Sequence, residues 1–228
     1  TILKLLVQQI DILETMTPLD FHEFRDFLRP ASGFQSWQFK MLEAKLGLKF
    51  DERHGQQYYL SMLKPEYVQF VKEVESQKTL LELIDDWLKR MPFFNDAQLW
   101  ANYHTPNTND SGYHAFWNDY LNAYASTLVE GEKQNIETFE KIFLSEHKSE
   151  HTILSSEAMR NALFISLYRG NPILQMPFQL MQNSLDIDEQ MATWRFRHIN
   201  MVHRMIGSRV GTGGSSGKEY LQGALNKH

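Results

Sequence analysis

The sequence predicts an all-helical protein, built as a single-domain bundle of about ten helices. Apolar residues recur at helical spacing along nearly all of the 228 residues, and convincing alternating strand patterns are missing. A chain of this length buries a substantial core without needing disulfides to hold it together. Prolines, glycines and capping residues divide the pattern into segments of ordinary helix length.

The first half of the chain divides at its prolines and glycines. Residues 1–16 form the first predicted helix, whose apolar face consists of Leu3, Leu6, Ile10 and Leu13. Thr17 and Pro18 supply an N-cap and a proline at the first helical position of the next helix, which Pro30 and Gly33 terminate. Further helices are predicted over residues 36–48, 65–77 and 79–91.

The second half begins with residues 92–112, which are rich in Asn, Asp and Pro and are predicted to be mostly loop. Helices are predicted over residues 113–130, 155–168 and 186–207. The region 172–177, with a proline at each end, is predicted to separate the last two of them. Residues 133–150 carry many charges and are predicted to be a peripheral helical excursion from the single domain 1–228.

Composition excludes several classes of protein. Cysteine is absent, so any metal must be held by nitrogen or oxygen, and the chain suits a reducing compartment such as the cytoplasm. The formal net charge is −5 with both signs interspersed, so neither nucleic acid nor an anionic membrane is an expected partner. No apolar run approaches the roughly 20 residues of a membrane span, and no secretory signal is present.

His198 lies on an apolar helical face and is a candidate metal ligand. At about 100° per residue, its neighbours within about 40° on that face are Ile187, Met191, Trp194, Val202 and Met205. A buried neutral imidazole is a good axial ligand for haem iron, although a core histidine satisfied by a hydrogen bond would show the same pattern. His203 lies about 140° away, which excludes a zinc site formed by two histidines on one helical face.

A glycine-rich segment, GTGGSSG, follows this helix at residues 211–217. Its glycines indicate positive φ angles or close approach to a ligand, and a flexible connector would have the same composition. The segment is not a phosphate-binding loop, because Thr212 stands where the first glycine is required and Glu219 replaces the Ser/Thr.

Arg25 is the third candidate. It lies about 40° from Phe21 on the apolar face of its predicted helix. A guanidinium against apolar surface is costly unless an anion meets it. That anion is either a structural carboxylate elsewhere in the fold or the carboxylate of a ligand.

Two stretches, LDFHEFRDFLRPASGFQS and TWRFRHINMVHRMIGSRVGTGGSSG, closely resemble the matching stretches of tryptophan 2,3-dioxygenases, as does PILQMPFQLMQNSLDIDEQMATWRFRH. The resemblance implies a b-type haem, ferrous in the active form, in a pocket between helices, with His198 as the proximal ligand and Trp194 and Val202 beside the haem. It also implies that Arg25 and Thr212 hold the amino-acid end of L-tryptophan.

The same resemblance implies that Phe21 lines the substrate site and that Ser32 and Gly33 form a turn near the distal side of the haem and the indole. The implied activity inserts O2 into the indole C2–C3 bond and gives N-formylkynurenine, the first step of tryptophan catabolism by the kynurenine pathway. The implied assembly is a homotetramer in which N-terminal segments pack against a neighbouring subunit.

One departure from the family pattern concerns the distal side. No part of the chain resembles the segment that carries the family's distal histidine, which is expected upstream of Thr1. Either the chain is a piece of a longer protein, as its start without Met suggests, or these groups come from a separate polypeptide. The alternatives for function are a haem enzyme acting on another indole compound and a non-catalytic helical haem-binding or scaffold protein.

Overall fold

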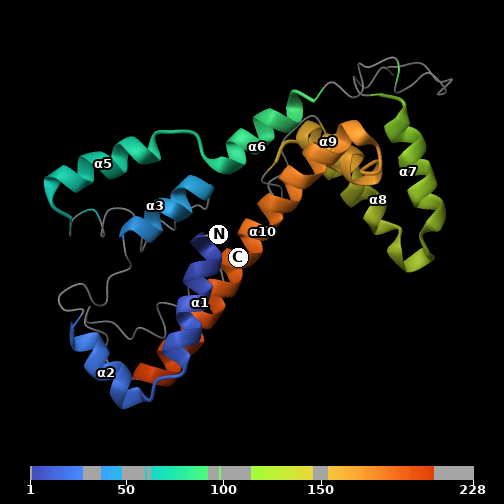
Figure 1. Ribbon diagram of the computed structural model, residues 1–228. Helices are drawn as coiled ribbons and strands as arrows, with labels where there is room; N and C mark the ends of the chain where they lie inside the picture. Colours follow the sequence, from blue (N-terminus) through green and yellow to red (C-terminus); the bar gives the residue numbers. More distant parts are fainter. Residues whose placement is uncertain are drawn as a thin grey trace. The chain divides into compact units, whose positions relative to one another are not determined.

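The computed structural model describes residues 2–27, 37–47, 60, 63–91, 98, 114–145 and 154–207. Within these ranges the secondary structure is helical and no strand occurs (Figure 1). The all-helical prediction is therefore confirmed for the described part of the chain. No described helix is both long enough and apolar enough to cross a membrane.

The chain forms two compact units. The first contains Thr1–Lys40, Gln56–Met62 and Met176–His228, and the second contains Met41–Gly55 and Leu63–Gln175. Residues near the two ends of the sequence thus share the first unit, which holds every candidate site residue. The assignment of residues 1–228 to one domain stays a prediction.

The first unit is built on α1 (Ile2–Glu14), α2 (Pro18–Phe27) and most of α10 (Pro172–Ile206). Its buried core residues come from all three helices and are Ile10, Phe21, Met201 and Met205. The start of α2 is fixed as the sequence predicts. Asp20 N–H donates to the Thr17 hydroxyl at 3.2 Å, and Thr17 N–H donates back to the Asp20 carboxylate at 3.1 Å.

The last helix begins earlier than predicted. α10 starts at Pro172 and continues through Pro177, so the region 172–177 is helical and does not separate two helices. Asn171 explains the start, because its side-chain oxygen accepts the Ile173 N–H at 3.2 Å and leaves Pro172 at the first helical position. Pro177 lies in the second turn, where it removes only one backbone hydrogen bond.

The second unit contains the elements between residues 63 and 175, and also the end of α3 (Trp37–Leu46). They are α5 (Pro65–Glu75), α6 (Leu80–Lys89), α7 (Phe116–Thr127), η2 (Glu130–Glu132), α8 (Gln134–Phe139), η3 (Glu140–Leu144) and α9 (Ser156–Leu167). The helices at 65–77, 79–91, 113–130 and 155–168 are confirmed, with bounds within a few residues of the prediction.

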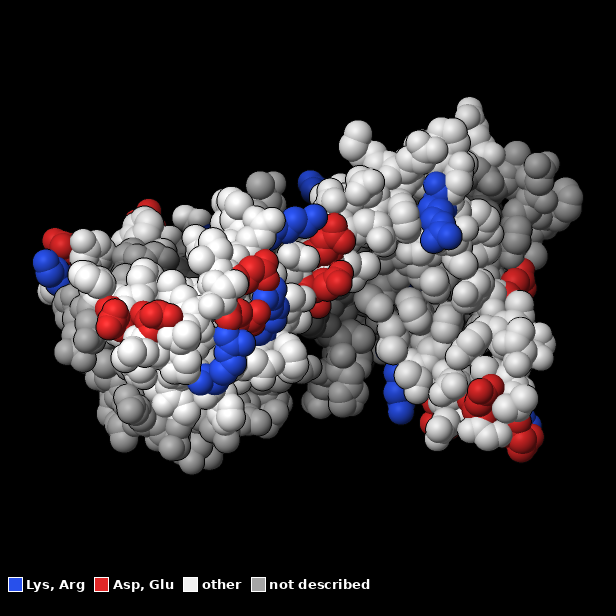
Figure 2. Space-filling model, turned by 60° about the horizontal axis from the view of Figure 1, so that its bottom comes forward, with Lys and Arg blue, Asp and Glu red and all other residues white. Residues whose placement is uncertain are grey.

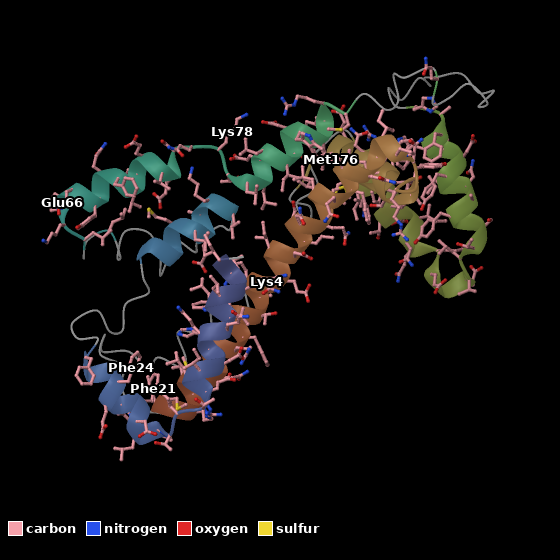
Figure 3. All side chains as sticks on the ribbon, in the orientation of Figure 1. Lys4, Phe21, Phe24, Glu66, Lys78 and Met176 are labelled. Carbon is pink, nitrogen blue, oxygen red and sulfur yellow. The ribbon has the colours of Figure 1, made fainter. Side chains whose placement is uncertain are left out.

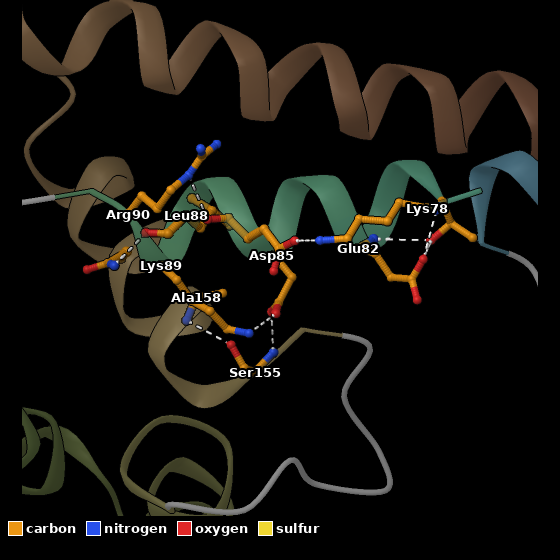
Figure 4. Close-up of polar contacts among 11 residues, drawn as sticks. Lys78, Glu82, Asp85, Leu88, Lys89, Arg90, Ser155 and Ala158 are labelled. Carbon is orange, nitrogen blue, oxygen red and sulfur yellow. Dashed lines mark hydrogen bonds and ion pairs between the residues drawn. The ribbon is translucent and has the colours of Figure 1, made fainter. Parts of the chain in front are cut away.

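Polar contacts join α6 to α9 (Figure 4). The Asp85 carboxylate accepts the N–H of Ser155, the N-cap residue of α9, at 2.6 Å, and also pairs with Lys89. The buried Asn161 side chain donates to the Leu88 carbonyl at 2.7 Å, near the end of α6. A backbone N–H at the start of α9 and a backbone carbonyl at the end of α6 thus each have a hydrogen-bond partner on the other helix.

The charged segment 133–150 is less separate from the core than its composition suggests. Its described charged side chains are exposed, but Phe139 is only 8% exposed. The Phe139 ring lies 5.8 Å from that of Tyr120 and 4.6 Å from that of Phe143. The apolar face of this segment therefore contributes to the aromatic core of the second unit.

Gly47 ends α3, and its replacement by alanine is expected to destabilise the protein. Its φ is +100°, and an added Cβ would lie 2.8 Å from Leu81 Cδ1. We expect Gly47→Ala to lower the free energy of unfolding by about 1–3 kcal/mol, measured by urea titration. Gly131→Ala is the matched control, because Gly131 has an ordinary φ and open space, and its effect should stay within about 0.5 kcal/mol. Equal effects of the two substitutions would contradict the strain argument.

His114, just before α7, makes stability depend on pH. It is 4% exposed, its Nδ1 accepts the Phe116 N–H at 3.1 Å, and burial lowers its pKa. Since the unfolded chain binds the proton more tightly, its contribution is fully present above about pH 6.5 and is lost as pH falls from there toward the folded pKa. Urea titrations between pH 7.5 and 5 should therefore show a shallower fall in stability for His114→Asn than for the native chain. Parallel curves would show that His114 does not titrate in this range.

Charged side chains are distributed without a large area of one sign on the face shown in Figure 2, as far as the described residues go. Lysine and arginine side chains lie next to aspartate and glutamate on this face. One such pair joins Lys78 and Asp86 at 2.5 Å. Exposed pairs of this kind contribute little to stability but keep the local field low.

Candidate functional site

His198 lies on α10 beside an indole ring. Its imidazole stacks on Trp194, with ring centroids 4.8 Å apart and an angle of 12° between the planes. Burial lowers the pKa of His198 below its ordinary value. The imidazole is therefore neutral at physiological pH, which is the state in which a ring nitrogen donates a lone pair to a metal.

The surroundings of His198 fit an axial ligand of haem iron. Within the described part of the chain, neither ring nitrogen of His198 has a hydrogen-bond partner. Met191 and Met205 are buried, and both lie on the same helical face as His198. A neutral imidazole without a competing bond, flanked by apolar side chains, is the donor that a porphyrin iron requires.

Phe21 of α2, which is labelled in Figure 3, packs against α10. It is buried with Met201 and Met205 in one cluster, against which Trp194 and Val202 pack as partly buried residues. The structure therefore brings together three of the predicted site residues: Phe21, Trp194 and Val202. His198 adjoins the cluster through its stacked partner Trp194.

The structure does not describe the side chains of the remaining predicted site residues. Arg25 lies in α2, one turn after Phe21, but its side chain is outside the described residues. Ser32, Gly33 and Thr212 also lie outside the described ranges. Their roles stay predictions.

A set of ionic contacts next to His198 was not predicted from the sequence. The Arg197 guanidinium pairs with Asp11 Oδ1 at 2.5 Å and with Glu14 Oε2 at 2.7 Å. Arg204 donates to the backbone carbonyl of Glu14. These contacts join α10 to α1 across more than 180 positions of sequence, so no local pattern signals them.

Comparison with known proteins identifies the family of this chain. The family model described as tryptophan 2,3-dioxygenase matches residues 1–228. Tryptophan 2,3-dioxygenase of Bdellovibrio bacteriovorus is 38% identical over 247 residues, covering 100% of this chain and 67% of that protein. The enzyme of Xenopus tropicalis is 39% identical and that of Mus musculus 37% identical; each comparison covers 99% of this chain and 58% of the relative.

The chain thus spans between 58% and 67% of the length of these relatives. The match nonetheless extends over the whole of the present sequence. The chain therefore belongs to the tryptophan 2,3-dioxygenase family.

Proposed function

We propose that this protein is a haem-dependent dioxygenase of L-tryptophan that produces N-formylkynurenine. The observation that carries the proposal is the state of His198. It is neutral, stacked on Trp194 and without a hydrogen-bond partner in the described part of the chain. Membership of the family supports the iron of a b-type haem as the partner of this imidazole.

The roles of the residues around the cofactor follow from their placement. His198 would hold the iron from the proximal side, while Trp194 and Val202 would pack near the macrocycle. When bound, ferrous haem supplies the oxygen chemistry that inserts O2 into the indole C2–C3 bond. The protein contributes ligation, positioning of the substrate and exclusion of water.

Substrate selection is proposed to rest on Arg25 and Thr212. The Arg25 guanidinium would bind the tryptophan carboxylate in a bidentate pair, and the Thr212 hydroxyl would hold the same end of the amino acid. Phe21 supports this arrangement, because it places the start of α2 against the face of α10 that carries the core methionines. Ser32 and Gly33 are proposed to form a turn close to the indole.

The test uses the protein at its full natural length. After reconstitution with haem we expect a Soret band, and turnover of L-tryptophan measured by the absorbance of N-formylkynurenine. Tryptamine, which lacks the carboxylate, should be turned over at least about 100-fold less efficiently in kcat/KM. Equal turnover of the two compounds would favour a haem enzyme for other indoles, and no Soret band would favour a non-catalytic scaffold.

We further propose a homotetrameric assembly in the cytoplasm, with N-terminal segments exchanged between subunits and the distal histidine supplied from outside residues 1–228. The absence of cysteine from the sequence is consistent with a reducing compartment. Light scattering of the full-length protein tests the assembly, and a monomer with full activity would contradict the proposed exchange.

A further inference from the structure

The contact between α1 and α10 contains a directional ionic part, which we call the arginine clamp: Arg197 with Asp11 and Glu14, and Arg204 with Glu14. Arg197 is 26% exposed in its side chain, Glu14 32% and Asp11 54%. The hydrogen bonds that Arg197 donates to the Glu14 and Asp11 carboxylates raise the pKa of Arg197. One guanidinium therefore bridges two carboxylates on successive turns of α1, in partly desolvated surroundings.

Arg204 completes the clamp at the end of α1. It follows Arg197 by seven residues and so projects from nearly the same side of α10, about 20° away. It donates to the backbone carbonyl of Glu14, the last residue of α1. Carbonyls in the last turn of a helix lack an intrahelical partner, so this bond also caps α1.

The clamp lies beside the proposed iron ligand. On α10, His198 projects about 100° from Arg197, and Trp194 projects between them, about 60° from Arg197. Trp194 packs against the core cluster that includes Ile10 of α1, and its indole stacks on the His198 ring. α1 therefore lies against the side of α10 next to His198 and shares a core cluster with the imidazole's stacking partner.

Apolar packing alone would allow small rotations of α10 about its own axis. The two buried residues on the α10 side of the cluster are Met201 and Met205, and methionine side chains adapt to small movements of their neighbours. A rotation of α10 by about 10° would move a side-chain tip roughly 1 Å, because such tips lie about 5–6 Å from the helix axis. Arg197 Nη2, held between the Asp11 and Glu14 carboxylates, and Arg204, bound to the Glu14 carbonyl, resist this rotation, since these charge-assisted contacts are directional.

We propose that Arg197 is a positioning residue for the haem ligand, and that the arginine clamp fixes the rotation of α10 about its axis and so the direction of the His198 imidazole. This inference rests on the proposed function of His198 as the iron ligand. It assigns Arg197 no contact with haem or substrate. Its effect passes through α10 and through the Trp194 stack.

The experiment measures the iron–histidine bond directly, in the full-length ferrous protein, by resonance Raman spectroscopy of the Fe–His stretching band. Arg197→Met should shift or broaden this band and weaken haem binding about 10-fold in a Soret titration. Arg197→Lys should retain part of the native behaviour, because one ammonium keeps the charge but cannot bridge both carboxylates with the same geometry. Arg90→Met is the matched control, since Arg90 lies in the second unit and bonds only to the Asp86 carbonyl of its own helix among the contacts described.

Two further measurements separate positioning from general stability. Glu14→Gln should move the Fe–His band in the same direction as Arg197→Met, and the double variant should move it no further. Native protein at 1 M NaCl should show a smaller shift in the same direction without any substitution, because salt weakens partly exposed ion pairs without breaking them.

The possible outcomes distinguish this inference from the proposed function. If Arg197→Met lowers the midpoint of urea unfolding but leaves the Fe–His band unchanged, the clamp is only structural and the inference is overturned. A native protein without any Fe–His band, or one that keeps the band after His198→Ala, overturns the proposed function and the inference together.

Discussion

Replacing His198 by alanine is expected to abolish turnover of L-tryptophan and to remove the Fe–His band, because the described helix α10 carries no other imidazole on this face and the indole nitrogen of Trp194 has no lone pair to donate. Haem affinity should fall by at least about 100-fold, since the loss of the ligand itself exceeds the 10- to 100-fold losses seen for residues that support a ligand. Soret titration of the apoprotein and the N-formylkynurenine assay measure the two effects.

His203→Ala is the matched control for this substitution. His203 lies on the same helix, five residues on, but projects about 140° away and is exposed. Its loss should leave haem affinity and turnover within about twofold of native, as expected for a surface substitution. The ligand assignment is wrong if the His203 variant loses haem and the His198 variant keeps it.

Replacing Arg25 by methionine is expected to lower kcat/KM for L-tryptophan by about 10²–10³-fold, or roughly 3–4 kcal/mol of transition-state binding. The reason is that the substrate carboxylate would then be desolvated without a charged partner. Haem binding should remain native, because His198 is untouched. Steady-state assays with L-tryptophan and tryptamine measure the effect, and the tryptamine rate should hardly change.

Glu23→Gln is the control for the Arg25 variant, since Glu23 lies two residues away on α2 and is exposed. Arg25→Lys should recover only part of the activity, because an ammonium cannot form the bidentate pair. Equal losses for L-tryptophan and tryptamine in Arg25→Met would show that Arg25 supports the fold and does not bind the carboxylate.

Much of the helical architecture could be predicted because it is encoded locally. The Thr17–Asp20 cap, the stop at Gly47 and the helix at 79–91 all follow from residues within one turn of the boundary. The start of α10 was missed although its signal is equally local. Asn171 followed by Pro172 is an N-cap followed by a proline at the first helical position. The prediction instead treats Pro172 and Pro177 as helix breaks.

The candidate site could be predicted only in part. Helical periodicity correctly grouped His198 with Trp194 on an inward-facing stripe, since both residues lie within one turn of the same helix. The partners of Arg197 could not be foreseen, because a solvated arginine and one bound to Asp11 and Glu14 have the same local sequence. Likewise, the burial of Phe139 depends on aromatic residues of α7, and the charges around it hide this contact.

The contact between α1 and α10 also has a consequence for biosynthesis. Asp11 and Glu14 leave the ribosome long before Arg197. The carboxylates of α1 therefore remain unpaired with Arg197 while the intervening residues are made. The second unit lies between them in sequence and can close first. On the proposed function, haem is therefore acquired late, and nascent chains arrested before α10 emerges should fail to retain it.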